Sequence, residues 1–121
     1  MVALDTLIKE EGPGISIILP IAQSAEKKNY EALKRVAQSA RGILKDKSYP
    51  EEIKDLLYLK LDDSTRVLPH YMLDSIGIFI SANQSAVINF PFPVRQKIKV
   101  DNGFETRDLL YLRQYSAPYY V

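Results

Sequence analysis

The hydrophobic residues of this chain follow two different spacings. In four segments, apolar side chains recur three and four positions apart, which predicts amphipathic helices. These segments are residues 3–11, 25–47, 50–63 and 106–114. Between them lie short runs rich in β-branched and aromatic residues, which predict strands. These runs are residues 15–19, 75–81, 86–90 and 95–100.

The longest predicted helix, residues 25–47, has a broad apolar face. A helical wheel at about 100° per residue places its core-facing side chains within one arc. They are Tyr30, Leu33, Val36, Ala37, Ala40, Ile43 and Leu44. Pro50, followed by Glu51 and Glu52, marks the start of the next helix, because acidic side chains suit the positive end of the helix dipole. We therefore expect two consecutive helices that each bury one side.

The order of elements predicts an α+β fold, a two-layer α/β sandwich in which helices pack on one mixed sheet of about four strands. Ile15–Leu19 and Ile76–Ile80 are the most apolar runs, so they are expected at the centre of the sheet. The helices between them form a crossover, which predicts a parallel, right-handed arrangement of these two strands. The last two strands are expected to form antiparallel edges. Gly12 and Gly14, on either side of Pro13, are interpreted as turn glycines that end the first helix.

The C-terminal residues have the pattern of a strand that is just beginning. They are Ala117-Pro118-Tyr119-Tyr120-Val121. The sequence thus predicts one domain over residues 1–117 and the start of a truncated second domain at 118–121. The alternative is a C-terminal edge strand of the same domain.

Composition excludes several classes of protein. Of 121 residues, 46% are apolar and 26% are charged, as expected for a globular domain rather than a disordered chain. Cysteine is absent, which excludes a disulfide scaffold and thiolate chemistry and fits a reducing compartment. No apolar run approaches the roughly 20 residues of a membrane helix, and no signal peptide is evident. We therefore expect a soluble, cytoplasmic domain without membrane association.

Charge is balanced overall but separated along the chain. The 16 Lys and Arg residues nearly match the 15 Asp and Glu residues, which argues against a strongly basic nucleic-acid binder. Residues 26–47, however, contain seven basic and three acidic residues, whereas 48–75 contain three basic and six acidic ones. Four cations form one stripe beside the apolar arc, hereafter the basic stripe: Lys27, Lys34, Arg41 and Lys45. Such a row suits an RNA phosphate backbone, although a solvated helix face with no ligand is the alternative.

Few residues suggest catalysis or metal binding. His70 is the only histidine, and a turn position without a ligand role explains it best. The nucleophile-elbow pattern Gly-x-Ser-x-Gly does not occur, and Gly12 and Gly14 precede a strand, whereas phosphate-binding glycines follow one. We therefore expect no catalytic residues, no metal and no cofactor in this chain.

The segment Phe90-Pro91-Phe92-Pro93 interrupts the strands with a stiff, apolar loop. Phe90 and Phe92 are candidates for docking another domain or another protein. Alternatively, both rings cap the core from beneath the loop.

Several segments share their pattern with one known family. These segments are Gly14–Pro20, Ile76–Ser81, Ala86–Phe92, Lys97–Phe104 and Thr106–Leu110. They resemble, in turn, a first strand, a later central strand, its hairpin partner, an edge strand with its turn, and a helix leading into the second domain. All belong to the N-terminal domain of the archaeo-eukaryotic peptide chain release factors. Over residues 14–121 the chain is similar to that domain in the bacterial branch of the superfamily, whose Phe-x-x-x-x-Leu-Leu segment corresponds to Phe104–Leu110.

The departures from the family pattern limit what the resemblance implies. The stop-codon-reading Asn-Ile-Lys-Ser motif has no counterpart in residues 26–75, and Gly42–Lys45 does not match it. Gly12–Gly14 replaces the family's Gly-Thr-Ser, and of the Tyr-x-Cys-x-x-x-Phe motif only Phe104 is retained, with Ile98 and Val100 at the other positions. The Gly-Gly-Gln motif of peptide release belongs to the second domain. The resemblance therefore implies a fold and an RNA or ribosome setting, but no active site.

Two hypotheses follow. In the first, the chain is a non-catalytic N-terminal module of a bacterial release-factor-like protein that contacts RNA or the ribosome through the basic stripe, without reading stop codons. In the second, it is a structural or interaction domain that packs on other domains of its own chain or on a partner protein. Catalysis, if any, belongs to a domain outside this sequence. Binding to DNA is not expected.

Overall fold

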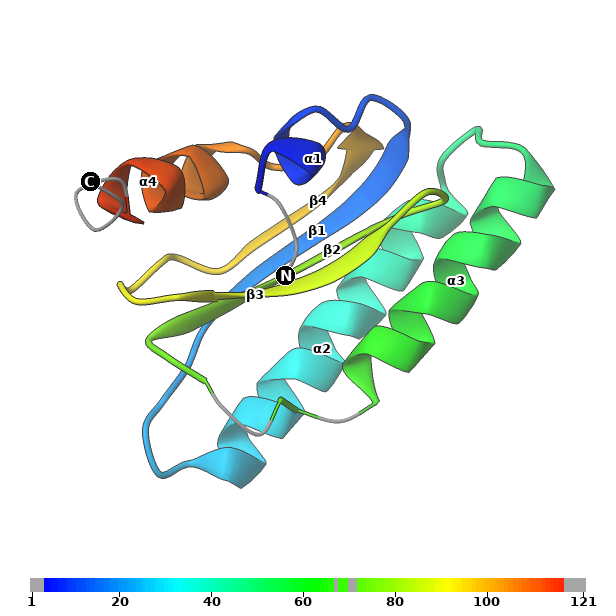
Figure 1. Ribbon diagram of the computed structural model, residues 1–121. Coiled ribbons are helices and arrows are strands. Elements are labelled where there is room, and N and C mark those ends of the chain that lie inside the picture. Colours follow the sequence, from blue (N-terminus) through cyan, green and yellow to red (C-terminus); the bar gives the residue numbers. More distant parts are fainter. Residues whose placement is uncertain (1–3, 67, 70–71, 117–121) are drawn as a thin grey trace.

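The computed structural model describes residues 4–66, 68–69 and 72–116 (Figure 1). This part of the chain forms four helices and one four-stranded sheet, so the predicted α+β fold with helices packed on a sheet is confirmed. In chain order the elements are α1 (Leu4–Ile8), β1 (Pro13–Pro20), α2 (Glu26–Lys45), α3 (Glu51–Thr65), β2 (Ser75–Ser81), β3 (Ser85–Phe90), β4 (Lys97–Asn102) and α4 (Arg107–Ser116). The expected start of a second domain at 118–121 lies outside the described residues.

The strand order is β3-β2-β1-β4, and each neighbouring pair is antiparallel. The two most apolar strands, β1 and β2, lie at the centre as predicted, with β3 and β4 as antiparallel edges. The predicted parallel pairing of β1 with β2 is wrong, and the sheet is antiparallel rather than mixed. Two helices connect these strands, and each reverses the direction of the chain. The second helix therefore returns the chain to the end where β1 stops, and Pro20 pairs with Ser75.

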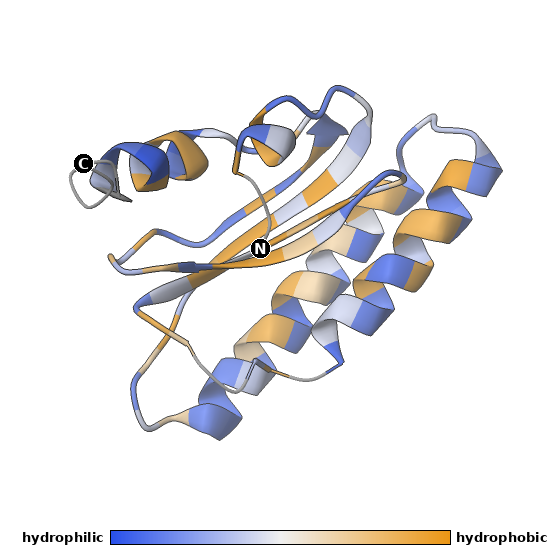
Figure 2. Cartoon of the chain, viewed as in Figure 1, coloured by the Kyte–Doolittle hydropathy of each residue, from blue (hydrophilic) through white to orange (hydrophobic). Residues whose placement is uncertain are grey.

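One face of the sheet is covered by α2 and α3, which lie side by side across it, and is hereafter the hairpin face (Figure 1). Its core consists of aliphatic side chains from the two helices and from β1, β2 and β4. The buried members are Ile15, Ile17, Leu19, Leu33, Val36, Ala37, Ala40, Leu44, Leu57, Leu61, Ile76, Ile78, Ile80 and Val100. Polar and apolar residues alternate around both helices (Figure 2), as amphipathic packing requires. The apolar arc predicted for α2 is buried except at its edges, where Ile43 is exposed and Tyr30 is half-buried.

The opposite face, hereafter the aromatic face, is covered by α1 and α4 (Figure 1). This second cover of helices is smaller, and the two-layer expectation did not include it. Its buried core brings three phenylalanine rings together with smaller apolar side chains. The members are Leu7, Ile18, Phe79, Ala86, Phe90, Val94, Phe104, Leu109 and Leu112. The two central strands, β1 and β2, are therefore buried on both sides.

Two strand glycines make room for these rings. A Cβ atom on Gly14 would lie 2.7 Å from the Phe104 ring, and one on Gly77 would lie 2.6 Å from the Phe79 ring and 2.8 Å from that of Phe90. Real Cβ atoms do not approach other atoms so closely. The rings of Phe79 and Phe104 meet edge to face, with centroids 5.5 Å apart. Gly14 therefore belongs to β1 and to ring packing, not to the turn predicted for it.

Two buried serines form hydrogen bonds that hold loop segments against the aromatic face. The Ser16 hydroxyl accepts a hydrogen bond from the backbone N–H of Glu105 at 2.9 Å. The Ser75 hydroxyl accepts one from the backbone N–H of Val94, also at 2.9 Å. Each bond gives a backbone N–H group outside the regular strands and helices a hydrogen-bond acceptor. The segments before β4 and before α4 are thereby fixed in place.

Candidate nucleic-acid interface

The outward side of α2 carries most of the positive charge of the helical layer. This 20-residue helix contains six basic and two acidic residues. Its inner side is held by the aliphatic core, so the charged side chains face away from the sheet. The distance along the helix axis from Lys27 to Lys45 is about 27 Å at a rise of about 1.5 Å per residue. The helix therefore presents a long, straight row of cations.

Of the basic stripe, Lys27, Lys34 and Lys45 are exposed, and Arg41 is half-buried. Arg41 differs because its guanidinium group forms an ion pair with Asp62 of α3. It also lies over the ring of Tyr58, 4.9 Å from the ring centroid. Arg41 thus ties α2 to α3 and contributes less free positive charge than the wheel predicts.

Two further cations share the exposed side of α2. Lys28 and Arg35 are exposed, and like Lys27, Lys34 and Lys45 they have no ion-pair partner among the described residues. These five side chains are hereafter the basic face. Lys28 and Arg35 could be predicted from the sequence, since a helical wheel places both opposite the apolar arc and outside the narrow basic stripe.

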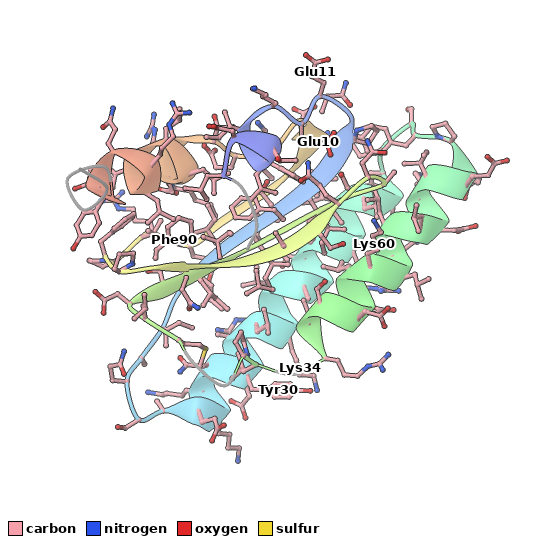
Figure 3. The ribbon with its side chains drawn as sticks, viewed as in Figure 1. Glu10, Glu11, Tyr30, Lys34, Lys60 and Phe90 are labelled. Atoms are coloured by element: carbon pink, nitrogen blue, oxygen red, sulfur yellow. The ribbon has the colours of Figure 1, made fainter. Side chains whose placement is uncertain are left out.

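Lys34 lies over the ring of Tyr30, with its Nζ 5.4 Å from the ring centroid (Figure 3). Tyr30 was assigned to the apolar arc, and it is half-buried at the edge of the core. An ammonium group over an aromatic ring gains about 0.5–1 kcal/mol at an exposed site. The contact positions Lys34 while leaving its charge accessible to solvent.

The neighbouring helix α3 has the opposite charge. It contains five acidic and two basic residues. Both of its lysines are directed to backbone carbonyl oxygens: Lys54 donates to Lys45 at 2.9 Å, and Lys60 donates to Ser81 and Ala82 at 2.7 and 3.1 Å (Figure 3). The helical layer is therefore divided into a basic side on α2 and an acidic side on α3.

A pocket of about 720 Å³ opens beside the N-terminal end of α2. Lys27, Tyr30 and Arg66 are among the side chains that line it. Its wall is shaped by Asn29, whose buried amide accepts from the backbone N–H of Ala22 at 3.0 Å and donates to the carbonyl of Ala22 at 2.8 Å. The pocket continues the basic face at one end of the helix.

No cluster of His, Cys, Asp and Glu suitable for a metal ion occurs among the residues that the structure describes. His70 lies outside those residues.

The Tyr49 phenol is a titratable group of the helical layer whose pKa is shifted. Burial and then the nearby carboxylate of Asp101 raise its pKa. Tyr49 belongs to the loop that connects α2 to α3, and its side chain packs against the core of the hairpin face.

The two phenylalanines proposed for docking have different surroundings. Phe90 is completely buried in the core of the aromatic face (Figure 3), so its ring offers no surface to a partner. Phe92 is partly buried and contacts two exposed tyrosines of α4. Its centroid is 4.7 Å from that of Tyr111 and 5.6 Å from that of Tyr115. The apolar spacing that predicts the last helix rests on its leucines and does not show that these two tyrosines are exposed.

The chain was compared with models of protein families and with curated protein sequences. No model of a protein family matches the chain, and no curated protein sequence matches it. Within the described ranges, no helix combines the length and the apolar character needed to cross a membrane.

Proposed function

We propose that this chain is a non-catalytic binding module that contacts RNA through the basic face of α2. The observation that carries this proposal is the set of five exposed cations on one helix, none of which is paired within the described part of the chain. Phosphate groups are the natural ligands of such a row, and their counterions are released on binding. The proposal involves binding alone, so it requires no catalytic residues.

The acidic side chains of α3 restrict where RNA can bind on the helical layer. The chain as a whole has a formal net charge of only +1, so long-range attraction to RNA is weak. Attraction arises locally at α2, while the carboxylates of α3 repel a polyanion that approaches beside it. A bound RNA would therefore follow α2 rather than spread over both helices.

The setting within the cell is part of the same proposal. The resemblance of residues 14–121 to the N-terminal domain of bacterial release-factor-like proteins favours ribosomal RNA over other RNA. Stop-codon reading is not part of the proposal, because the Asn-Ile-Lys-Ser motif has no counterpart in residues 26–75.

A second candidate function is protein interaction through α4. The observation that favours it is the exposed pair Tyr111 and Tyr115 beside Phe92, since tyrosine is enriched at the centres of protein interfaces. This surface lies on the opposite side of the sheet from α2 (Figure 1). The two candidate functions can therefore be tested by separate substitutions.

The test compares two triple charge reversals that change the net charge equally. The first, Lys27→Glu, Lys34→Glu and Lys45→Glu, alters the basic face. The second, Lys9→Glu, Arg95→Glu and Arg107→Glu, alters exposed cations outside α2 and α3. Both proteins are checked for folding by circular dichroism and thermal melting. Their affinity for ribosomes and for mixed RNA is then titrated from about 50 to 200 mM salt.

The proposal predicts that the first variant loses at least about tenfold in affinity. The slope of log K against log salt should also become less steep by about two to three, because three phosphate contacts are lost. The second variant should keep the slope of the wild type. Equal losses in both variants, or no RNA binding by the wild type at about 50 mM salt, would contradict the proposal.

A further inference from the structure

We infer that the basic face of α2 binds double-helical RNA in preference to single-stranded RNA. This inference rests on the proposed function and deepens it by naming the form of RNA. It follows from what the basic face contains, what it lacks and how rigidly its charges are held.

Among the described residues, the basic face contains no fully exposed aromatic ring on which a base could stack. Proteins that hold single strands combine cations with exposed aromatic rings, because every base offers a flat face to a ring. Ile43 is the one large apolar side chain of α2 that is exposed. Tyr30 and Tyr58, which contact cations of α2, are half-buried, and each has a cation above its ring, Lys34 and Arg41 respectively. The chemistry available to RNA here is therefore contact with phosphates.

The charges of this face are held in a straight, preformed row. Lys27, Lys34 and Lys45 are anchored on one uninterrupted helix, whose buried side packs on the sheet. Along the axis, Lys27 and Lys34 are about 10 Å apart, and Lys34 and Lys45 about 16 Å apart. A double helix is stiff and presents its phosphates at regular intervals, so it meets such a row without being reordered. A flexible single strand must lose conformational freedom to do the same.

Charge density favours the same form of RNA. A duplex concentrates the phosphates of two strands along one axis. Duplex DNA releases about 0.9 counterions per phosphate contact and single strands about 0.7, and we expect the RNA duplex to differ from its single strand in the same direction. Proteins recognise double-stranded RNA mainly by its shape and by its phosphates and 2′-hydroxyls. A surface with cations and no stacking rings therefore binds a duplex more tightly through phosphate contacts. A single strand cannot make up this difference, because its unpaired bases find no ring to stack on.

The two exposed tyrosines of the described residues lie away from the basic face. Tyr111 and Tyr115 are on α4, on the opposite side of the sheet from α2 (Figure 1). Single-stranded RNA that required stacking would use these rings rather than α2. Substitution of the two tyrosines therefore distinguishes the two sites.

The experiment measures the affinity of the full chain for a duplex of about 20 base pairs and for one of its strands, chosen to be free of internal pairing. Four proteins are compared at the same salt: the wild type, the Lys27→Glu/Lys34→Glu/Lys45→Glu variant, the Lys9→Glu/Arg95→Glu/Arg107→Glu control, and a Tyr111→Ala/Tyr115→Ala variant. The wild type is expected to bind the duplex about tenfold more tightly than the single strand, because the duplex has the denser row of phosphates and releases more counterions per contact. The first variant should lose this binding, whereas the control and the tyrosine variant should retain it.

Three other results would overturn the inference, and they identify the cause. If the single strand binds as tightly as the duplex and the first variant weakens both, the basic face binds RNA but does not select its form, and the proposed function stands. If the single strand binds more tightly and only the tyrosine variant loses it, α4 is the RNA site. If the wild type binds neither RNA, the inference and the proposed function fail together.

Discussion

The two faces of the sheet are covered in different ways. The hairpin face is packed by aliphatic residues that recur at regular intervals on β1, β2, α2 and α3. The aromatic face is packed by phenylalanine rings that fit over glycines, and by loop segments that are fastened to buried serines. Regular packing occupies only the inner side of α2 and leaves its outer side free to carry charge. Packing on the hairpin face therefore holds α2 in place with its candidate binding surface exposed. The stability of the aromatic face depends on the close fit between phenylalanine rings and strand glycines.

The largest expected effect comes from removing a ring of the aromatic face. Phe90→Ala should lower the free energy of unfolding by about 3–5 kcal/mol, because it deletes a completely buried ring and leaves a cavity. Phe92→Ala should cost clearly less, since this ring is only partly buried. Urea denaturation of both variants measures the difference. A cost for Phe90→Ala no larger than that for Phe92→Ala would show that the aromatic face is not a packed core.

A methyl group added beneath the rings should have the next largest effect. In Gly77→Ala the new Cβ would lie 2.6 Å from the Phe79 ring and 2.8 Å from the Phe90 ring, so both rings must shift. Forced overpacking of this kind costs about 1–3 kcal/mol. Thermal and urea denaturation provide the value. An unchanged stability would mean that the aromatic face adapts easily and does not depend on close fit.

A glycine-to-alanine substitution on the outer side of α2 should instead stabilise the protein. A Cβ on Gly42 would meet no atom within 4 Å, because this residue lies on the outer side of α2. Gly42→Ala should therefore raise the free energy of unfolding by about 0.5–1 kcal/mol, as expected for glycine within a helix. A destabilised Gly42→Ala protein would contradict the outward orientation of this side of α2.

The smallest effect concerns pH and the attachment of the N-terminal segment to the β2–β3 turn. Burial raises the pKa of Glu10, but hydrogen bonds from Ser81, Gln84 and the backbone N–H groups of Gly12 and Glu11 outweigh it and lower the pKa below 4.5. The folded state therefore favours the carboxylate. Its contribution to stability is complete above pH 4.5 and is lost as the pH falls below that value.

Glu10→Gln should remove this part of the pH dependence. Stability measured by urea denaturation between about pH 3 and pH 6 should fall less steeply toward acid in the variant than in the wild type. Glu11→Gln is the control, because the Glu11 side chain is exposed and makes no hydrogen bond within the described residues. Parallel curves for wild type and Glu10→Gln would assign the acid sensitivity to other groups.

Regular spacing explains which parts of the fold could be predicted. The strands, the helices and the inner residues of α2 follow from repeated apolar positions, such as Leu33, Ala37 and Leu44. The repeats also predict the two helices between β1 and β2, and two reversals of the chain direction imply an antiparallel pair. The prediction of a parallel pair is wrong because it treats the two helices as a single crossover. The fit of Phe104 over Gly14, by contrast, is absent from any local pattern, since the two residues meet only in the folded sheet.

The candidate interface shows the same division. A wheel identifies cations on one side of α2, but it cannot show that Asp62 of another helix pairs with Arg41. Nor does it show that Lys54 and Lys60 of α3 are directed to backbone carbonyls, leaving that helix with an acidic surface. Such contacts between elements decide which charges remain available for a ligand.

The most direct test of the account is an NMR titration of the ¹⁵N-labelled chain with a short RNA duplex. The account predicts that the amide signals that move are those of α2, centred on Lys27, Lys34 and Lys45, and that they return toward their free positions as salt is added. Shifts confined to α4 around Tyr111 and Tyr115, or no shifts at low salt, would contradict it.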